Sequence, residues 1–204
     1  MKISFACLED IEKILMVQNR AFEHINDKEM LVTLSKDEIM DNINDEVLCV
    51  CKNGDEVIAF RSMHIPKKDY LGKYVSNMSV SQKNIIYSDI SIVHPDYRGL
   101  GLQKKMGEWL FERIPEGYTI IMATVHPDNI ASIKDKFHHD MHIIAKDFVY
   151  GDKVRYIFLK YRDERRKCGE EIAIHVDDVY KIERLLNEGF IAVDIRDNLL
   201  IFTK

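Results

Sequence analysis

Residues 94–105 read "HPDYRGLGLQKK" and place two glycines, Gly99 and Gly101, between Arg98 and the start of an expected helix. Glycine has no Cβ, so its backbone adopts positive φ angles and approaches ligands closely. Successive N–H groups that lead into a helix N-terminus form a binding site for phosphate. A tight turn that requires glycine would explain the same residues, and the loop matches neither a Walker A sequence nor the triple-glycine dinucleotide motif. The segments on either side of the loop distinguish between an anion site and a plain turn.

The segments on either side of the loop predict a strand before it and a helix after it. "IIYSDISIV" (residues 85–93) is a β-rich run that ends at His94-Pro95. In the segment that follows, Leu102, Met106 and Leu110 recur at helical spacing, and Pro115 stops the pattern. The loop therefore joins a strand to a helix, which is the setting that an anion site requires.

The rest of the chain predicts an ordered series of strands and helices. The N-terminal segment indicates a strand and then a helix, and Ser35 with Glu38 has the spacing of a capping box that opens a second helix. Asn53-Gly54 and Gly151-Asp152 indicate hairpin turns. Between the two hairpins we expect a strand at residues 118–125 and a short helix that Pro127 opens. Residues 66–84 lack a pattern and indicate a long connection.

The combined pattern resembles the GNAT superfamily of N-acetyltransferases. "IVHPDYRGLGL" is similar to the acyl-CoA-binding motif of that family, with Gln103 in place of the last glycine or alanine, and "VHPDNIAS" resembles its second motif. The resemblance implies an α+β, GNAT-like acyl-CoA N-acyltransferase fold, with a mixed, mostly antiparallel sheet of about seven strands flanked by helices. It covers residues 1–161, which we expect to form the acetyltransferase domain. Residues 162–204 are expected to form a charged linker and a small strand-helix-hairpin extension.

The resemblance implies acetyl-CoA as the co-substrate. The residues that match its two motifs and are expected to bind the cofactor are Ile92, Val93, Arg98, Gly99, Leu100, Gly101, Leu102, Gln103 and Asn129. A backbone N–H near Val93 would polarise the thioester carbonyl.

The resemblance also implies direct transfer of an acetyl group to a primary amine in a ternary complex. In "IIYSDISIV", strict alternation would place Tyr87, Asp89 and Ser91 on one face of a strand that should be apolar, so we expect Asp89 and Tyr87 to be catalytic. An exposed face or a bulge would explain the same residues. The family tyrosine that serves as general acid is replaced by Lys136. A non-catalytic acyl-CoA-binding protein therefore stays open as the alternative, while a Rossmann domain is disfavoured because the motif lies mid-chain.

Composition limits the remaining possibilities. The net charge of −5 argues against a nucleic-acid partner. No apolar run reaches about 18 residues, which argues against a membrane partner, and four scattered cysteines suit a cytoplasmic protein. We expect no metal, because His138, His139 and His142 lie around a helix end where solvated or capping roles are favoured. The acceptor, a small-molecule or peptide amine, is expected to be set by the first helix pair, residues 66–84 and the late hairpin. A homodimer stays open.

Overall fold

The computed structural model describes residues 1–25, 31–75, 84–162 and 169–204. These residues form ten strands: the seven expected up to residue 161 and three in the tail. The chain divides into two compact units, residues 1–65 with 87–117 and residues 66–86 with 118–204, and each is described by itself. Parts of the expected linker (163–168) and of the long connection (76–83) lie outside the described residues. Within the described residues, no helix combines the length and apolar character needed to cross a membrane.

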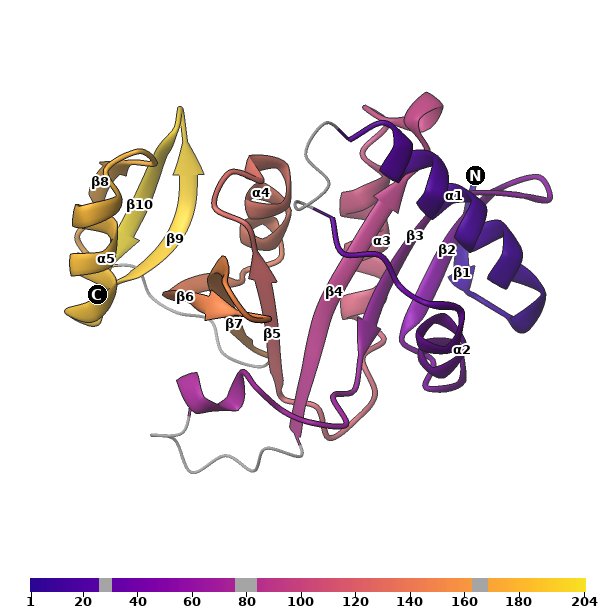
Figure 1. Cartoon of the computed structure of the whole chain (residues 1–204), viewed down its shortest axis with the longest axis horizontal. Helices are drawn as coiled ribbons and strands as arrows, with labels where there is room; N and C mark the ends of the chain where they lie inside the picture. Colours follow the sequence, from indigo (N-terminus) through magenta and orange to yellow (C-terminus); the bar gives the residue numbers. More distant parts are fainter. Residues whose placement is uncertain (26–30, 76–83, 163–168) are drawn as a thin grey trace. The chain divides into compact units, whose positions relative to one another are not determined.

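The first unit is an antiparallel sheet with helices on both faces (Figure 1). Its strands lie in the order β1-β2-β3-β4. Its elements are β1 (Lys2–Phe5), η1 (Leu8–Asp10), α1 (Ile11–Glu23), α2 (Lys36–Asn44), β2 (Leu48–Asn53), β3 (Glu56–His64), β4 (Ile85–Val93), η5 (Pro95–Tyr97) and α3 (Leu102–Phe111).

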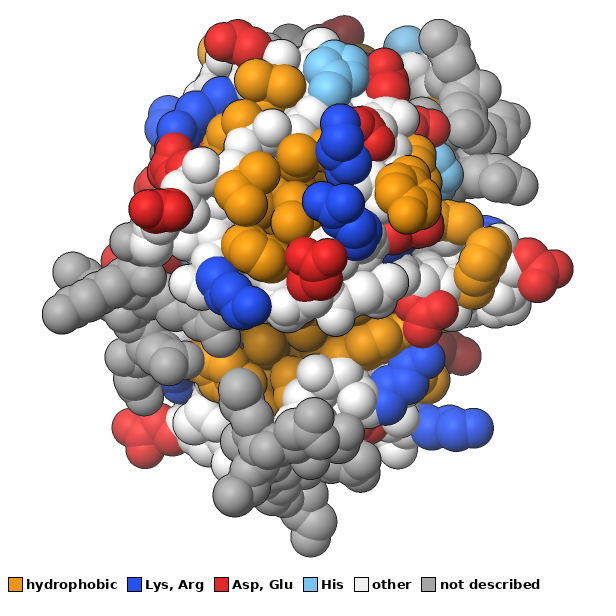
Figure 2. Space-filling model, turned by 90° about the vertical axis from the view of Figure 1, so that its left-hand side faces the viewer, with side chains coloured by type: hydrophobic (Ala, Val, Ile, Leu, Met, Phe, Trp, Pro, Cys, Tyr) orange, Lys and Arg blue, Asp and Glu red, His pale blue; other side chains and the backbone are white. Residues whose placement is uncertain are grey.

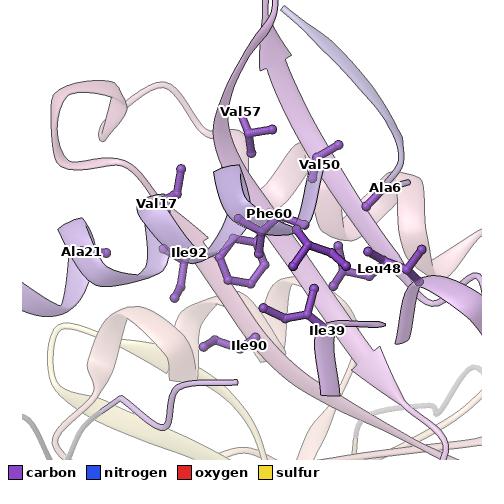
Figure 3. Packing of buried hydrophobic residues seen from close by; sticks show 13 residues of the cluster. Ala6, Val17, Ala21, Ile39, Leu48, Val50, Val57, Phe60, Ile90 and Ile92 are labelled. Carbon is purple, nitrogen blue, oxygen red and sulfur yellow. The ribbon is translucent and has the colours of Figure 1, made fainter. Parts of the chain in front are cut away.

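The core of this unit lies between the sheet and helices α1 and α2 (Figure 3). Phe60 of β3 and Ile39 of α2 are fully buried, and Ile92 of β4 is 3% exposed. Burial of each such side chain contributes roughly 1.5–3 kcal/mol relative to exposure. The other face of the sheet carries α3, where the Cys49 thiol of β2 lies 3.8 Å from the Met106 carbonyl oxygen. The sheet is therefore covered on both sides.

Local sequence signals explain where several of these elements begin. The Ser35 hydroxyl accepts from the Glu38 backbone N–H at 3.2 Å, and the Glu38 carboxylate accepts from the Ser35 N–H at 2.7 Å. This confirms the predicted capping box at the start of α2. Gly54, with φ of +62°, turns the chain between β2 and β3 as the Asn-Gly pair predicts.

The second unit has the strand order β5-β7-β6-β9-β10-β8. Its elements are η3 (Gly72–Tyr74), β5 (Ile120–Val125), α4 (Ile130–His138), β6 (His142–Val149), β7 (Lys153–Tyr161), β8 (Ile172–His175), α5 (Val179–Asn187), β9 (Ile191–Arg196) and β10 (Leu199–Thr203). The helix predicted to open at Pro127 begins three residues later, because the Asn129 side chain accepts from the Ser132 N–H and caps it.

The tail forms the strand, helix and hairpin that its sequence predicts. It continues the sheet of the second unit, because Ala192 of β9 pairs with Ile143 of β6. Figure 2 shows the side of this unit that carries β8 and α5, where hydrophobic side chains are exposed among charged ones. Among the exposed residues of α5, Tyr180 is 75% and Val179 46% accessible. The boundary expected between residues 161 and 162 stays a prediction.

Candidate active site

The two glycines of the loop are required by their backbone angles. Gly99 has φ of +80°, and Gly101, the N-cap of α3, has φ of +69°. A side chain is strained in this left-handed region, by roughly 1–2 kcal/mol. A Cβ added at either position would meet no atom within 4 Å, so the space above the loop is open. The backbone N–H groups in the first turn of α3 have no acceptor within the helix. They directly follow this open loop.

Positive charge surrounds the N-terminus of α3. Arg98 directly precedes the glycines and is exposed, and so are Lys104 and Lys105 in the first turn of the helix. The helix N-terminus adds about half a positive elementary charge of its own. Within the first unit, the loop thus has the backbone geometry and the electrostatic sign that a pyrophosphate group requires.

Arg61 of β3 is a buried cation that sequence reasoning missed. It is 1% exposed, its Nη1 donates to the Gln103 carbonyl oxygen at 3.3 Å, and its guanidinium lies 5.5 Å from the centre of the Phe111 ring. The contact ties the central strand to the first turn of α3. Its position gave no signal in the sequence, because β3 also contains the polar residues Ser62 and His64.

A β-bulge in β4 corrects the predicted alternation of faces. Arg61 pairs with Ser91 but Met63 pairs with Ser88, so β4 carries one more residue than β3 between these pairs. Asp89 contacts His64 and so shares the α1/α2 side with Ile90, a member of the core cluster there. Ser91 lies opposite Arg61, whose guanidinium reaches α3. The expected common face of Tyr87, Asp89 and Ser91 is therefore wrong, because the extra residue moves Ser91 to the other side.

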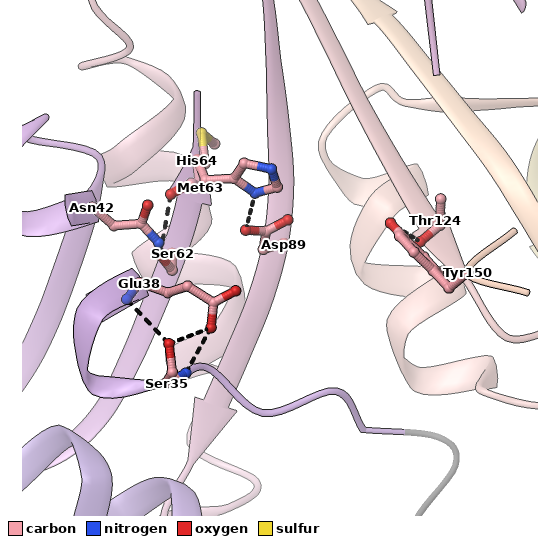
Figure 4. A network of polar contacts seen from close by, with 9 residues as sticks. All are labelled: Ser35, Glu38, Asn42, Ser62, Met63, His64, Asp89, Thr124 and Tyr150. Atoms are coloured by element: carbon pink, nitrogen blue, oxygen red, sulfur yellow. Dashed lines mark hydrogen bonds and ion pairs between the residues drawn. The ribbon is translucent and has the colours of Figure 1, made fainter. Parts of the chain in front are cut away.

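His64 forms the centre of a small polar group on the α2 side of the sheet (Figure 4). Its Nδ1 contacts the Asp89 carboxylate, and its ring packs edge to face against Tyr87, with centroids 5.0 Å apart. The side chains of His64 and Asp89 are 29% and 22% exposed, so both reach solvent, whereas Tyr87 is 2% exposed. The sequence indicated Asp89 and Tyr87 as candidates but gave no signal for His64. This histidine is the last residue of β3 and is distant in sequence from the two residues of β4.

The charge of the histidine responds to this environment. Burial lowers the pKa of His64, but the hydrogen bond and negative charge of Asp89, with the charge of Glu38, outweigh burial and raise that pKa above its ordinary value. Nearby, the Asn42 amide donates to the Ser62 hydroxyl at 2.9 Å and fixes α2 against β3. The His64–Asp89 pair can accept a proton and hold it as an imidazolium–carboxylate pair.

The end of β4 carries the other residues expected at the donor site. Ile92 belongs to the core cluster, while Val93 pairs with Ala59 and is partly exposed. Among the residues that the structure describes, Ser91 Oγ is buried without a hydrogen-bond partner. Buried hydroxyls normally have a partner, so a ligand that supplies one would satisfy this group.

Two further candidates lie in the second unit. Asn129 uses its side-chain oxygen as the cap of α4, 3.1 Å from the Ser132 nitrogen. The side chain of Lys136, where the family places a tyrosine, is 5% exposed and 4.0 Å from the Asp135 carboxylate. His139 is buried beside the same carboxylate at 3.6 Å. Over the described ranges, no three His, Cys, Asp or Glu side chains gather as metal ligands would, and the expectation of no metal stays a prediction.

Comparisons with known proteins agree with this geometry. The model of the Acetyltransferase (GNAT) family matches residues 8–142. No curated protein matches the chain.

Among solved structures, the putative acetyltransferase YncA from Salmonella typhimurium, with its cofactor acetyl-CoA, is 18% identical (TM-score 0.60), over 83% of this chain and 98% of its own. PaiA N-acetyltransferase from Thermoplasma acidophilum, in complex with coenzyme A, is 14% identical (TM-score 0.57), over 78% and 98%. Diaminobutyrate acetyltransferase EctA from Paenibacillus lautus, in complex with L-2,4-diaminobutyric acid and coenzyme A, is 14% identical (TM-score 0.57), over 81% and 97%. The fold is the GNAT fold, α+β with a mixed sheet flanked by helices, and the chain belongs to the GNAT acetyltransferase family.

Proposed function

We propose that the chain is an acetyl-CoA-dependent N-acetyltransferase that acts on a primary amine by direct transfer in a ternary complex. The observation that carries the proposal is the His64–Asp89 pair beside the bulge of β4, in the same unit as the positive glycine loop. Family membership supports an acetyltransferase, and the acetyl-CoA bound by one neighbour and the coenzyme A bound by another support acetyl-CoA as co-substrate. The diamino acid bound by a third neighbour supports an amine as acceptor.

The glycine loop would hold the donor. The amides at the start of α3 and the Arg98 guanidinium would bind the pyrophosphate of CoA, with Gly99 and Gly101 giving the backbone its approach. Leu100, Leu102 and Gln103 would line the same turn, and Asn129 would hold the CoA arm. Near the end of β4, Ile92 and Val93 would flank the thioester.

The chemistry requires a neutral amine, because an ammonium has no lone pair for attack. The amine nitrogen would attack the thioester carbonyl carbon, the C–S bond would break, and CoA would leave as a thiolate. The proton released from the nitrogen would pass to His64, directly or through water, and Asp89 would stabilise the imidazolium that forms. Tyr87 would orient the imidazole through its ring contact. In this assignment His64 accepts the proton, and the expected catalytic residues Asp89 and Tyr87 act through the imidazole.

Substitution of Asp89 by Asn tests the assignment. Asp89→Asn removes the charge that stabilises the imidazolium, so we expect kcat/KM for acetyl transfer to fall by about 100-fold or more, in the range of general-base effects. Affinity for acetyl-CoA should stay unchanged, because Asp89 lies away from the glycine loop in the strand. CoA thiol release over a panel of amines measures turnover, and calorimetry measures donor binding. Asp37→Asn, at an exposed carboxylate of α2, is the matched control.

A non-catalytic acyl-CoA-binding protein is the second candidate. The buried Lys136 at the position of the family tyrosine favours it, because the usual hydroxyl donor for the departing thiolate is missing there. Tight binding of acetyl-CoA with no CoA release over the whole amine panel would establish this alternative. Turnover that depends on Asp89 would exclude it.

A further inference from the structure

Strand β8 forms an edge of the sheet of the second unit. It pairs antiparallel with β10, and within the part of the chain that the structure describes no strand pairs with its other side. Ile172, Ala173 and His175 of this strand are exposed. Natural edge strands often carry a lysine, a proline or a bulge that prevents pairing with another chain, and β8, with the sequence IAIH, has none of these. The edge of β8 is therefore open to a further strand.

The hydrogen bonds of β8 determine which of its backbone groups point away from the sheet. The Val176 N–H donates to the Asn198 carbonyl oxygen at 2.9 Å. Hydrogen-bonded pairs alternate along an antiparallel ladder, so the even-numbered residues of β8 direct their N–H and C=O groups toward β10. The odd-numbered residues direct theirs outward, although the His175 carbonyl oxygen already accepts from the Asp178 N–H. The outward groups available for pairing include the His175 N–H, the N–H and C=O of Ala173, and the C=O of Glu171.

A second copy of β8 matches these outward groups when Ala173 lies opposite the partner's Ala173 on a two-fold axis. Each Ala173 N–H then donates to the other Ala173 carbonyl oxygen, and each His175 N–H donates to the carbonyl oxygen of the partner's Glu171. A register centred on Ile174 would instead bring Glu171 opposite the partner's Asp177, and like charges directly opposite each other are destabilising. Charge therefore favours the register centred on Ala173.

The apolar side chains of β8 also match in this register. Each Ile172 lies opposite the partner's Ile174, at non-hydrogen-bonded positions, where the side chains of an antiparallel pair are closest. On β10 the residues opposite these two are Phe202 and Leu200, which are both fully buried. Pairing of two copies would extend this apolar row across the interface and would cover Ile172, which is 37% exposed.

The polar side chains of the opposite face are complementary as well. Each Glu171 lies opposite the partner's His175, and these side chains are 44% and 50% exposed. His175 Nδ1 accepts from the Asp177 N–H at 3.4 Å, so Nε2 carries a proton that it can donate to a carboxylate. The Glu171 carboxylate accepts from Arg196 at 3.0 and 3.3 Å, and a carboxylate has further lone pairs for another donor.

We propose that the edge of β8 is an interface between two copies of this chain. The two β8 strands pair antiparallel about a two-fold axis at Ala173, with Ile172 against the partner's Ile174 and Glu171 against the partner's His175. The interface lies in the tail and is independent of acetyl transfer. Because β8 has only four residues, the contact is small, and small interfaces are typical of transient complexes, so the dimer should form reversibly as concentration rises.

Sedimentation equilibrium of the full chain over a wide range of concentrations tests the interface. The wild-type chain should shift from monomer to dimer as the concentration increases. Ala173→Pro removes the N–H groups of the central hydrogen bonds and should weaken dimerisation about tenfold or more. This N–H points away from β10, so the pairing of β8 with β10 keeps its hydrogen bonds and the variant should fold. Ala173→Ser keeps the N–H and is the matched control, which should dimerise like the wild type.

Charge substitutions test the register. His175→Glu places a carboxylate opposite the partner's Glu171 and should weaken dimerisation several-fold. Adding Glu171→Lys to His175→Glu restores opposite charges and should recover most of the lost affinity. Both variants lack the imidazole, so their comparison isolates the charge pair, and circular dichroism checks that each variant folds.

Three outcomes would overturn the proposal. A wild-type chain that stays monomeric at every concentration, or a dimer that persists unchanged in folded Ala173→Pro, would exclude the β8 edge as the interface. A double variant that dimerises no better than His175→Glu would exclude the register centred on Ala173.

Discussion

The pKa of His64 and its proposed role can be explained only together with Asp89. The carboxylate raises the pKa of the imidazole, so the protonated pair stabilises the folded state at pH values below the ordinary histidine pKa. This stabilisation is lost as the pH rises through the raised pKa of the folded protein. Asp89 is also what allows the histidine to take and keep a proton in the proposed reaction.

A titration of His64 tests the coupling directly. In the wild-type chain the imidazole resonances should titrate above the ordinary histidine value, and in Asp89→Asn they should titrate lower, because burial then lowers the pKa with only Glu38 opposing it. Two-dimensional NMR of imidazole-labelled protein measures both values, with His64→Gln identifying the signal. The lower limb of the pH profile of kcat/KM should shift in the same direction. An unchanged titration in Asp89→Asn would contradict the pairing.

At the scale of single residues, the sequence predicted Asp89, one member of the pair proposed to take the proton, and missed the other member, His64. A carboxylate in the apolar run "IIYSDISIV" is anomalous by itself, so Asp89 could be found. His64 ends a strand and Arg61 lies within one, and neither position is unusual until the pairing of β3 with β4 is known. Alternation also fails at a bulge, because one extra residue exchanges the faces of all that follow.

The helix caps show how far the local sequence determines where a helix begins. The Ser35 and Glu38 capping box begins α2 where the sequence predicts it. In contrast, Pro127 suggested an early start for α4, but the side chain of Asn129 accepts from the Ser132 N–H and sets the start at Ile130. The spacing of residues predicted the start of α2 correctly, because a single capping residue was present there. It predicted the start of α4 too early, because both Pro127 and Asn129 are residues that can begin a helix.

Asn129 offers a test that separates capping from donor binding. Asn129→Ala removes the cap and should lower the free energy of unfolding by about 1 kcal/mol. Asn129→Ser keeps an acceptor for the cap but loses the amide donors. If Asn129 also holds the CoA arm, Asn129→Ser should keep its stability and bind acetyl-CoA about tenfold more weakly. Urea denaturation and calorimetry measure the two effects, and unchanged affinity in Asn129→Ser would restrict the residue to capping.

At the scale of the whole chain, the tail repeats the topology of the segment before it. In both, the first strand pairs with the third and the third with the second, as in β5-β7-β6 and β8-β10-β9. The turns that follow the first strands are alike, because His126 and His175 accept from the N–H two residues on, at 3.2 and 3.4 Å. The following helices are capped by Asn129 and Asp178 with nearly equal backbone angles. The repeated order was visible in the sequence, whereas the pairing of β6 with β9 was not.

This pairing implies that the tail is part of the folded second unit, and Ile182 tests it. Ile182 of α5 is fully buried, so Ile182→Ala should lower the free energy of unfolding by about 2–5 kcal/mol, as large-to-small core substitutions do. Val179→Ala, on the same helix but 46% exposed, should change it by less than about 0.5 kcal/mol. Urea denaturation followed by circular dichroism measures both variants. A tail that was only tethered to the chain would leave the main transition at the same urea concentration in Ile182→Ala. A shift of that transition would instead show that residues 172–204 unfold together with the strands they extend.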